Sequence, residues 1–491
     1  MSLPKLSRRE LLERSMFATA AAVAAQHAKV PFALAQGADS PNEKIRIGVI
    51  GAGGRGGEHI SQFQNRKNSE IGAIIDVDEA IAQRRIEKIA EETGKRPAYY
   101  SDIRKALEDK SIDAVSVATP NHWHSLAAIW SMQAGKDVYV EKPVSHNVSE
   151  GRRCVQVARK YQKICQTGTQ SRSEKGMREA IEFVHKGGIG EVKLARGLCY
   201  KRRGSIGPRG TYEAPKTVDY DLWSGPAQLK PVTRPKFHYD WHWQWDYGNG
   251  DLGNQGIHQM DIARWGLGVS DLGESVLSYG GRLGYEDAGE TGNTQVCIHR
   301  YGDKRLVFEV RGLETPDLKA PKSEVEGAKV GVIFYGSEGY MVMPSYSSGV
   351  VFDLEGKMVQ QFKGGGDHFG NFLSACRSRK HEDLNADILE GHLSSALCHL
   401  GNISYRLGEQ LPVKEIAKKL EGDAEALETF GRVSEHLVAN KVDLDSKAYF
   451  GLNLPLDGKA EFFTGTHAAA ANPMLTREYR KPYVVPAEKD V

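Results

Sequence analysis

The chain has 491 residues, 40% hydrophobic and 26% charged, which is ordinary for a soluble globular protein long enough to bury a sizeable core. Its 65 basic and 63 acidic side chains leave a formal net charge of +2, so nothing in the charge indicates nucleic acid or an anionic membrane surface as a partner. The six cysteines form no C-x-x-C pair, and we predict no metal site.

The first 36 residues have the three parts of a secretory signal, in the right order. A charged stretch with Arg8 and Arg9 precedes an apolar, Ala-rich run at 16–25, and Ala33-Leu34-Ala35 has the form of a cleavage site. The apolar run is too short for stable membrane insertion. The paired arginines resemble a twin-arginine signal. We predict a Tat-type signal peptide and linker at 1–36, the twin-arginine translocase as a partner and a periplasmic or otherwise exported protein; the alternative is a disordered basic N-terminus before an Ala-rich helix.

If the protein is exported, its six cysteines could form disulfides. Their wide spacings define no disulfide framework, however, and cysteine is among the residue types most often buried. We therefore expect mostly buried free thiols.

Strands alternate with helices in the next part of the chain, which predicts a parallel, doubly wound sheet. We expect strands at 44–50, 71–75, 114–119 and 137–141, and helices at 58–65, 78–93, 124–134 and 149–160. This first domain is predicted to span 44–166.

A glycine motif, Gly51-x-Gly53-x-x-Gly56, lies between the first strand and the first helix, which is the context that a dinucleotide-binding Rossmann fold requires. The first glycine permits the tight turn, the second lets the backbone approach a pyrophosphate, and the third lets the helix pack on the strand. Gly54 and Arg55 lie in the same loop and are predicted cofactor contacts. The alternative is a glycine-rich turn without a ligand.

Asp76 ends the next strand, where a carboxylate can accept hydrogen bonds from the ribose hydroxyls of adenosine. It would repel a 2′-phosphate, so NAD is favoured over NADP. Arg84 and Arg85 lie further along the chain and do not replace it.

Two further turns follow predicted strands, and the carboxyl ends of parallel strands are where open α/β sheets bind ligands. Lys142 could hold a substrate hydroxyl or a cofactor ribose; alone, it would be read as a solvated surface charge. The predicted cofactor contacts from these turns are Thr119, Pro120, Asn121, His124, Glu141 and Lys142.

The pattern of predicted elements changes near residue 166, after which strands follow one another without helices between them. We expect strands at 192–200, 274–281, 294–299 and 305–311, an ordered loop at 223–245, helices at 368–379, 387–407 and 424–438, and an extended tail from 457 onward. This predicts an α+β domain at 167–491 with an open, mixed, mainly antiparallel sheet.

A third group of polar residues surrounds His258 in the sequence. Asp261 lies three residues later, so on a helix it shares a face with His258, and Asn254 lies four residues before His258. A histidine near a carboxylate can take a proton from an alcohol near neutral pH. The alternative is a satisfied, partly buried histidine.

The chain resembles the Gfo/Idh/MocA oxidoreductases from about residue 44 to at least 407. The resemblance rests on four motifs that occur in the family's order: the glycine motif, the Pro-Asn-x-x-His turn, Glu-Lys-Pro and the His-x-x-Asp segment. The resemblance implies that Lys142 lies at the nicotinamide and substrate, that His258 is the acid/base and that Asp261 contacts substrate. Asn254 stands where the family usually has aspartate, and an amide cannot carry the proton or the negative charge. The resemblance also implies a homo-oligomer.

Further substrate contacts are expected from two segments. In the family, the segment leaving the first domain faces the substrate, which makes Gln170 and Arg172 candidates. The aromatic loop at 238–245, with Trp243, is either a platform for a sugar ring or a core patch.

These features predict an exported NAD(P)-dependent oxidoreductase that acts on a secondary hydroxyl of a sugar, polyol or glycoside. Because a periplasm holds no pool of free NAD, the cofactor is expected to be loaded before export and held tightly. The alternatives are an NAD-dependent glycoside hydrolase that works by transient ring oxidation and elimination, and a non-catalytic sugar-binding protein.

Overall fold

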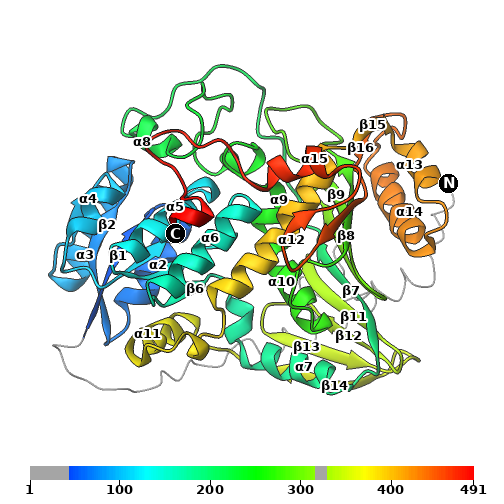
Figure 1. Ribbon diagram of the computed structural model, residues 1–491, viewed down its shortest axis with the longest axis horizontal. Coiled ribbons are helices and arrows are strands. Elements are labelled where there is room, and N and C mark those ends of the chain that lie inside the picture. Colours follow the sequence, from blue (N-terminus) through cyan, green and yellow to red (C-terminus); the bar gives the residue numbers. More distant parts are fainter. Residues whose placement is uncertain (1–43, 316–328) are drawn as a thin grey trace.

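The structure is a computed structural model that describes residues 44–315 and 329–491 (Figure 1). The predicted signal peptide lies outside the described residues. The described part contains two sheets, each with helices on both of its faces. Within it, no helix is both long and apolar enough to cross a membrane.

The first sheet confirms the predicted doubly wound domain. Its six described strands are all parallel, in the order β3-β2-β1-β4-β5-β6. The strands are β1 (Ile45–Ile50), β2 (Ser69–Ile75), β3 (Ala98–Tyr100), β4 (Ala114–Val117), β5 (Asp137–Val140) and β6 (Cys165–Thr167). The helices between them are α2 (Gly54–Gln64), α3 (Glu79–Thr93), α4 (Ile103–Glu108), α5 (Asn121–Gln133) and α6 (Val148–Lys160). Strands β3 and β6 and helix α4 were not predicted, because they are too short to show a hydrophobic period in the sequence.

Both faces of this sheet are buried, which explains its nearly continuous apolar strands. Helices α4, α5 and α6 cover one face, where Ile50 and Val115 pack. Helices α2 and α3 cover the other, together with α11 (His368–Ser378) from much later in the chain, whose Phe372 packs against the face that contains Ile47. The first domain is therefore completed by a distant segment.

The second sheet is mixed and mainly antiparallel, as predicted. Of its twelve described strands, β10 pairs with β7 in parallel and the remaining pairings are antiparallel. The strands on its main path are β7 (Val192–Cys199), β8 (Ser275–Gly281), β9 (Thr294–Tyr301), β10 (Lys304–Arg311), β11 (Val330–Gly336), β12 (Tyr340–Met343), β13 (Ser348–Phe352), β14 (Met358–Lys363), β15 (Glu409–Pro412) and β16 (Lys447–Phe450). The short strands β17 (Leu454–Asp457) and β18 (Phe462–Phe463) lie off it.

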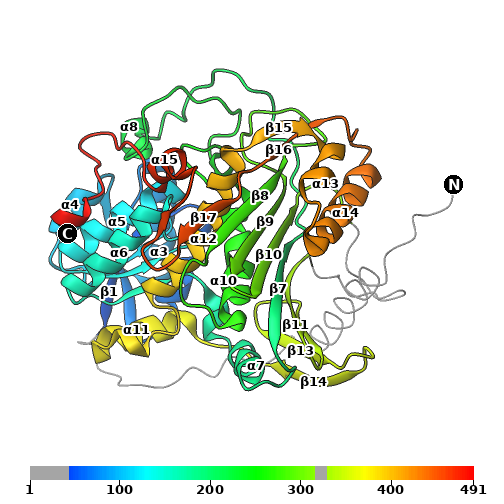
Figure 2. The same ribbon diagram turned by 45° about the vertical axis from the view of Figure 1, so that its right-hand side comes forward.

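Helices cover both faces of the second sheet (Figure 2). On one face lie α7 (Lys175–His185), α10 (Gly256–Leu267) and α12 (Ile388–Arg406), and on the other α13 (Ile416–Lys419) and α14 (Ala424–Ala439). The remaining short helices are α8 (Tyr220–Ser224), α9 (Gly250–Asn254) and α15 (Ala468–Ala471).

Helix α12 joins the two halves, because it packs on α6 of the first domain and on α10 of the second. The Ser395 hydroxyl accepts a hydrogen bond from the backbone N–H of Val144 at 3.1 Å, and the Ser145 hydroxyl lies 3.1 Å from His399 Nε2. These bonds hold the segment that follows Lys142 against the second domain.

Two expectations about the later chain need correction. The tail is not simply extended, since it contains β18 and α15 before Tyr483 and Val485 enter the core of the first domain. The aromatic loop contains the end of α8 and a 3-10 turn at Asp240–Trp243. The cysteine expectation is confirmed: all six are buried and free.

Candidate active site

A cleft of about 520 Å³ lies at the carboxyl ends of β1, β2, β4 and β5. Every predicted cofactor contact except Gly56 lines it. These lining residues are Gly51, Gly53, Gly54, Arg55, Asp76, Thr119, Pro120, Asn121, His124, Glu141 and Lys142, joined by Asn254 from the second domain.

The glycine loop has the geometry that its sequence requires. Gly51 adopts φ +84°, in the left-handed region that glycine tolerates best. A Cβ on Gly56 would lie 1.8 Å from the carbonyl oxygen of Gly51, so this residue serves the close packing of α2 on the strand rather than the cleft.

The residues present in the cleft fit a dinucleotide. A Cβ on Gly53 or Gly54 would meet no protein atom within 4 Å, so the backbone there is open to a ligand. No side chain caps the first turn of α2, whose N–H groups and positive dipole end suit a pyrophosphate. The Thr119 Oγ1 is buried at the cleft without a partner among the described residues, which is the state expected of a group that bonds a ligand.

Gly53→Ala is expected to weaken NAD binding by about 10- to 100-fold without lowering the melting temperature, because the added methyl occupies ligand space and touches no protein atom. Gly56→Ala is the matched control and should lower the melting temperature, because its methyl overlaps the Gly51 carbonyl. NAD titration and thermal unfolding measure the two effects. Equal loss of NAD affinity and of stability in both variants would contradict this division of roles.

Asp76 lies where the ribose of adenosine is expected. Its two carboxylate oxygens accept hydrogen bonds from the backbone N–H groups of Ala52, at 2.7 Å, and Asp78, at 2.9 Å. Burial raises its pKa above 3.8, and the two N–H bonds oppose that shift. These bonds hold the carboxylate in place at the cleft wall.

At the wall of the cleft, Glu141 is held by a hydrogen-bond network that was not predicted from the sequence. Its Oε1 accepts a hydrogen bond from Arg55 Nε at 2.7 Å and lies 3.0 Å from His59 Nε2. The other ring nitrogen of His59 lies 2.6 Å from the Ser116 hydroxyl. Burial acts to raise the pKa of Glu141, but the charge of Arg55 and the bond from His59 hold it well below 4.5. His59 lies on α2, one turn after Arg55, and this helical spacing was the available signal.

Lys142 and Asn254 line the cleft, and His258 lies outside its lining but close enough for the charge of Lys142 to act on it. The Lys142 Nζ donates to the carbonyl oxygen of Asn254 at 3.0 Å, bridging the two domains. Burial lowers the pKa of Lys142 below 10.5, although Glu141 opposes the shift. Burial, and then the charge of Lys142, lower the pKa of His258 well below 6.5. His258 lies on α10, and its ring centroid is 4.9 Å from that of Tyr346.

Asp261 and Arg172 bind each other instead of lining the cleft. The Arg172 Nε lies 2.8 Å from one carboxylate oxygen of Asp261, and its Nη2 is 2.9 Å from the other. The Ser394 hydroxyl donates to the same carboxylate at 2.6 Å. Asp261 is 1% exposed and Arg172 is 6% exposed, so this pair supports α10 from behind.

The aromatic loop presents residues other than the predicted one to the cleft. Trp243 is 4% exposed and packs with Ile206 and Ala288, which is the core-patch alternative. Trp241 and His242, whose rings stack at 3.6 Å, line the cleft. Gln170 is half-buried at the start of a 3-10 turn and lies outside the cleft lining.

Two ranges of the chain match the two domains of one known family. Residues 45–169 match the NAD-binding Rossmann fold of the Gfo/Idh/MocA oxidoreductases, and residues 209–434 match the C-terminal alpha/beta domain of the same family. The chain belongs to the Gfo/Idh/MocA oxidoreductase family. The first domain is therefore an NAD-binding domain.

Among relatives in sequence are two proteins of Shewanella. Glycosyl hydrolase family 109 protein 1 of Shewanella sp. (strain ANA-3) is 32% identical over 154 residues, which is 30% of this chain and 34% of that protein. The alpha-N-acetylgalactosaminidase of Shewanella oneidensis matches with the same identity and shares. The match thus spans about a third of the length of these relatives.

Solved structures share the fold. The WlbA dehydrogenase of Bordetella pertussis, crystallised with NADH and UDP-GlcNAcA, has a TM-score of 0.55 at 20% identity, covering 74% of this chain and 97% of that one. A probable dehydrogenase of Thermotoga maritima has a TM-score of 0.50 at 22% identity, covering 73% and 95%. Across residues 44–315 and 329–491, no group of three or more His, Cys, Asp or Glu side chains is placed to hold a metal ion.

Proposed function

We propose that this protein is an oxidoreductase that uses bound NAD to oxidise or reduce a secondary alcohol carbon of a sugar, polyol or glycoside. The observation that carries the proposal is the position of Lys142, which lines the dinucleotide cleft, bonds the Asn254 carbonyl and acts electrostatically on His258 beside it. There one side chain can stabilise an alkoxide while the other takes its proton.

The protonation states suit this chemistry. Because its pKa lies well below 6.5, the imidazole of His258 is neutral near pH 7 and can accept the hydroxyl proton. Lys142 uses one N–H for the Asn254 carbonyl, which leaves two to stabilise the developing oxyanion. Bound NAD would supply the acceptor for the hydride that leaves carbon, so that the alcohol becomes a carbonyl.

The loop between β7 and α9 supports a tightly held cofactor. It crosses from the second domain to the first, where His238 Nε2 lies 3.0 Å from the Asp78 carboxylate and the Thr217 hydroxyl donates to it at 2.8 Å. Trp223, Tyr239 and Trp241 from this loop line the cleft. A dinucleotide beneath this cover would leave slowly.

The proposal is tested by denaturing the purified protein to release its dinucleotide, and by mixing the native protein with a panel of sugars while following the absorbance of reduced nicotinamide. Release of NAD or NADH and a change in its redox state with at least one sugar are expected. Protein that neither contains nor binds a dinucleotide would sink the proposal.

A second candidate is glycoside cleavage without net redox, favoured by the glycosyl hydrolase family 109 names of the matched relatives. In such a reaction the sugar is oxidised transiently, loses its aglycone by elimination, takes up water and is reduced again. Release of free sugar from aryl glycosides by the protein with its bound cofactor, and no added NAD, would favour this candidate. Net accumulation of NADH with a free sugar would favour the dehydrogenase.

Asp76→Asn is expected to weaken NAD binding about tenfold and to reduce the preference for NAD over NADP, since the amide keeps one acceptor but loses the charge that repels a 2′-phosphate. Dissociation constants for both dinucleotides measure the change. An unaltered preference would assign the discrimination to other residues.

We propose, too, that the protein is exported through the twin-arginine pathway, on the support of Arg8, Arg9 and the Ala33-Leu34-Ala35 site. Replacing both arginines by lysine should keep the protein in the cytoplasm in a fractionation experiment.

We likewise propose a homo-oligomer. The edge strand β14 and the turn before it expose apolar side chains, with Leu354 63% and Val359 61% exposed, and such an edge favours pairing. Light scattering during gel filtration would measure the assembly.

A further inference from the structure

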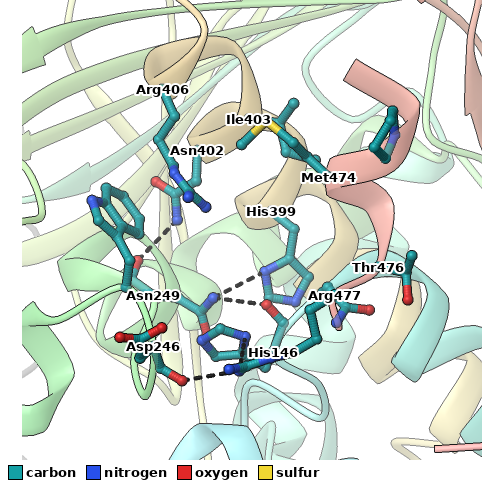
Figure 3. Close-up of a pocket in the computed structure, with 13 residues that line it drawn as sticks. His146, Asp246, Asn249, His399, Asn402, Ile403, Arg406, Met474, Thr476 and Arg477 are labelled. Carbon is teal, nitrogen blue, oxygen red and sulfur yellow. Dashed lines mark hydrogen bonds between the residues drawn. The ribbon is translucent and has the colours of Figure 1, made fainter. Parts of the chain in front are cut away.

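A second cavity, of about 240 Å³, lies outside the dinucleotide cleft and shares no lining residue with it. Its walls come from the C-terminal half of α12, the loop before α9 and the C-terminal segment that follows α15 (Figure 3). The wall residues that carry the argument are His146, Asn249, His399, Asn402, Arg406 and Arg477.

Two guanidinium groups dominate its charge. Arg477 uses Nη1 to donate to the backbone oxygen of Asp246 at 2.9 Å and lies 3.2 Å from His146 Nδ1, so neither contact is with a carboxylate. Arg406 stacks over the Trp245 ring at 5.0 Å and has no hydrogen bond or ion pair with any residue of 44–315 or 329–491. The nearby carboxylate of Asp246 is already paired with Lys230 at 2.8 Å.

The positive charge is therefore only partly compensated. Arg406 is exposed at the edge of the cavity; partial desolvation by the surrounding protein lowers its pKa below 12.5, and Arg477 adds to that shift against the opposing charges of Asp246 and Glu290. A negative ligand between the two arginines would remove this repulsion and satisfy their unused N–H groups.

The floor of the cavity is built of neutral polar groups in fixed positions. The Asn249 Nδ2 donates to the His146 carbonyl at 3.0 Å and lies 3.4 Å from His399 Nδ1, and the Asn402 Nδ2 donates to the Asn249 carbonyl at 3.0 Å (Figure 3). Burial lowers the pKa of His399 to about 3 and that of His146 well below 6.5, so neither ring adds charge. The Nε2 of His146 is buried with no hydrogen-bond partner in the described protein.

We propose that this cavity is a binding site for a small oxyanion, either free phosphate or the carboxylate of a small organic acid, held by Arg406 and Arg477. Its volume of about 240 Å³ is less than half that of the dinucleotide cleft, at about 520 Å³, and suits such an anion. Ile403 and Met474 on the walls can contact a short carbon chain.

The test is calorimetric titration of the whole protein, saturated with NAD so that the pyrophosphate site is filled, with inorganic phosphate and separately with succinate. One saturable site is expected. Arg406→Gln and Arg477→Gln should each weaken it at least tenfold, because each removes a charge-assisted hydrogen-bond donor. Arg406→Lys, which keeps the charge but not the planar fork, should lose less.

Arg202→Gln is the matched control, because Arg202 is an exposed arginine that pairs with Glu314 away from the cavity, and it should bind the anion like the parent. Melting temperatures measured without anion separate a folding defect from loss of binding. Tighter binding of phosphate or of succinate identifies the source of the oxyanion. The absence of saturable binding for both anions, or equal loss in the control, overturns the proposal. Because binding is measured without turnover, failure of the proposed redox reaction leaves this test intact.

Discussion

His258→Ala is expected to lower kcat by about 10²- to 10⁴-fold, the usual contribution of a positioned general base. The physical reason is that the variant retains the cleft and Lys142 but has no neutral imidazole to accept the hydroxyl proton. Affinity for NAD should be unchanged, because His258 lies outside the residues that line the dinucleotide cleft. Steady-state turnover with the best sugar of the panel and NAD titration measure both quantities.

The control is His381→Ala, since His381 is a partly exposed histidine remote from the cleft, paired with its neighbour Glu382. It should retain parental turnover. Turnover that survives in His258→Ala would exclude His258 as the base; bound sugar without any turnover in the parent would favour the non-catalytic sugar-binding interpretation.

His258 and Lys142 together determine the expected pH dependence of the reaction. Protonation of His258 removes the base, and because its pKa lies well below 6.5, the acid limb of kcat/KM should also lie well below that pH. Deprotonation of Lys142 removes the positive charge, and because its pKa is lowered from 10.5, the alkaline limb should lie below pH 10.5. Lys142→Met should abolish the alkaline limb along with most of the activity.

Arg172→Met is expected to destabilise the protein by about 3 kcal/mol or more and to lower its melting temperature by about 3–5 °C. The loss arises because Asp261, which is 1% exposed, keeps its charge but loses its bidentate partner. The Ser394 hydroxyl and Arg264, 4.0 Å away, compensate only in part. Differential scanning calorimetry measures the effect.

The double variant Arg172→Met, Asp261→Asn provides the control, since it removes the unpaired charge and keeps the acceptor for Ser394. It should recover most of the lost stability. KM for the sugar should change little in the folded double variant if the pair only supports α10. A large rise in KM with normal stability would instead support the substrate contact by Asp261 and Arg172 that the family resemblance implies.

The first domain was readable from sequence because its signals are local. The alternation of strands and helices is visible in the periodicity of the side chains. The glycine motif is needed for backbone geometry within six residues, from the left-handed conformation of Gly51 to the close approach at Gly56. Lys142 was found by its position after a strand, and the parallel sheet then carried it into the cleft.

The parts that sequence did not reveal depend on contacts between distant residues. Arg172 and Asp261 are 89 positions apart, and each alone resembles a polar candidate for the site; only their mutual burial shows that they satisfy each other. Trp241 and Trp243 differ by two positions, yet a 3-10 turn directs one to the cleft and the other to the core. No local pattern distinguishes such neighbours.

By itself, therefore, the sequence determined the two kinds of sheet, the dinucleotide loop and the pairing of a lysine with a histidine as candidates for chemistry. The tertiary structure alone decided which polar side chains face the cleft, how the loop between β7 and α9 covers it, and that Arg406 and Arg477 meet at a second cavity. The physical reason is that periodicity and backbone strain act over a few residues, whereas the satisfaction of a buried charge depends on whichever residue the completed fold brings beside it.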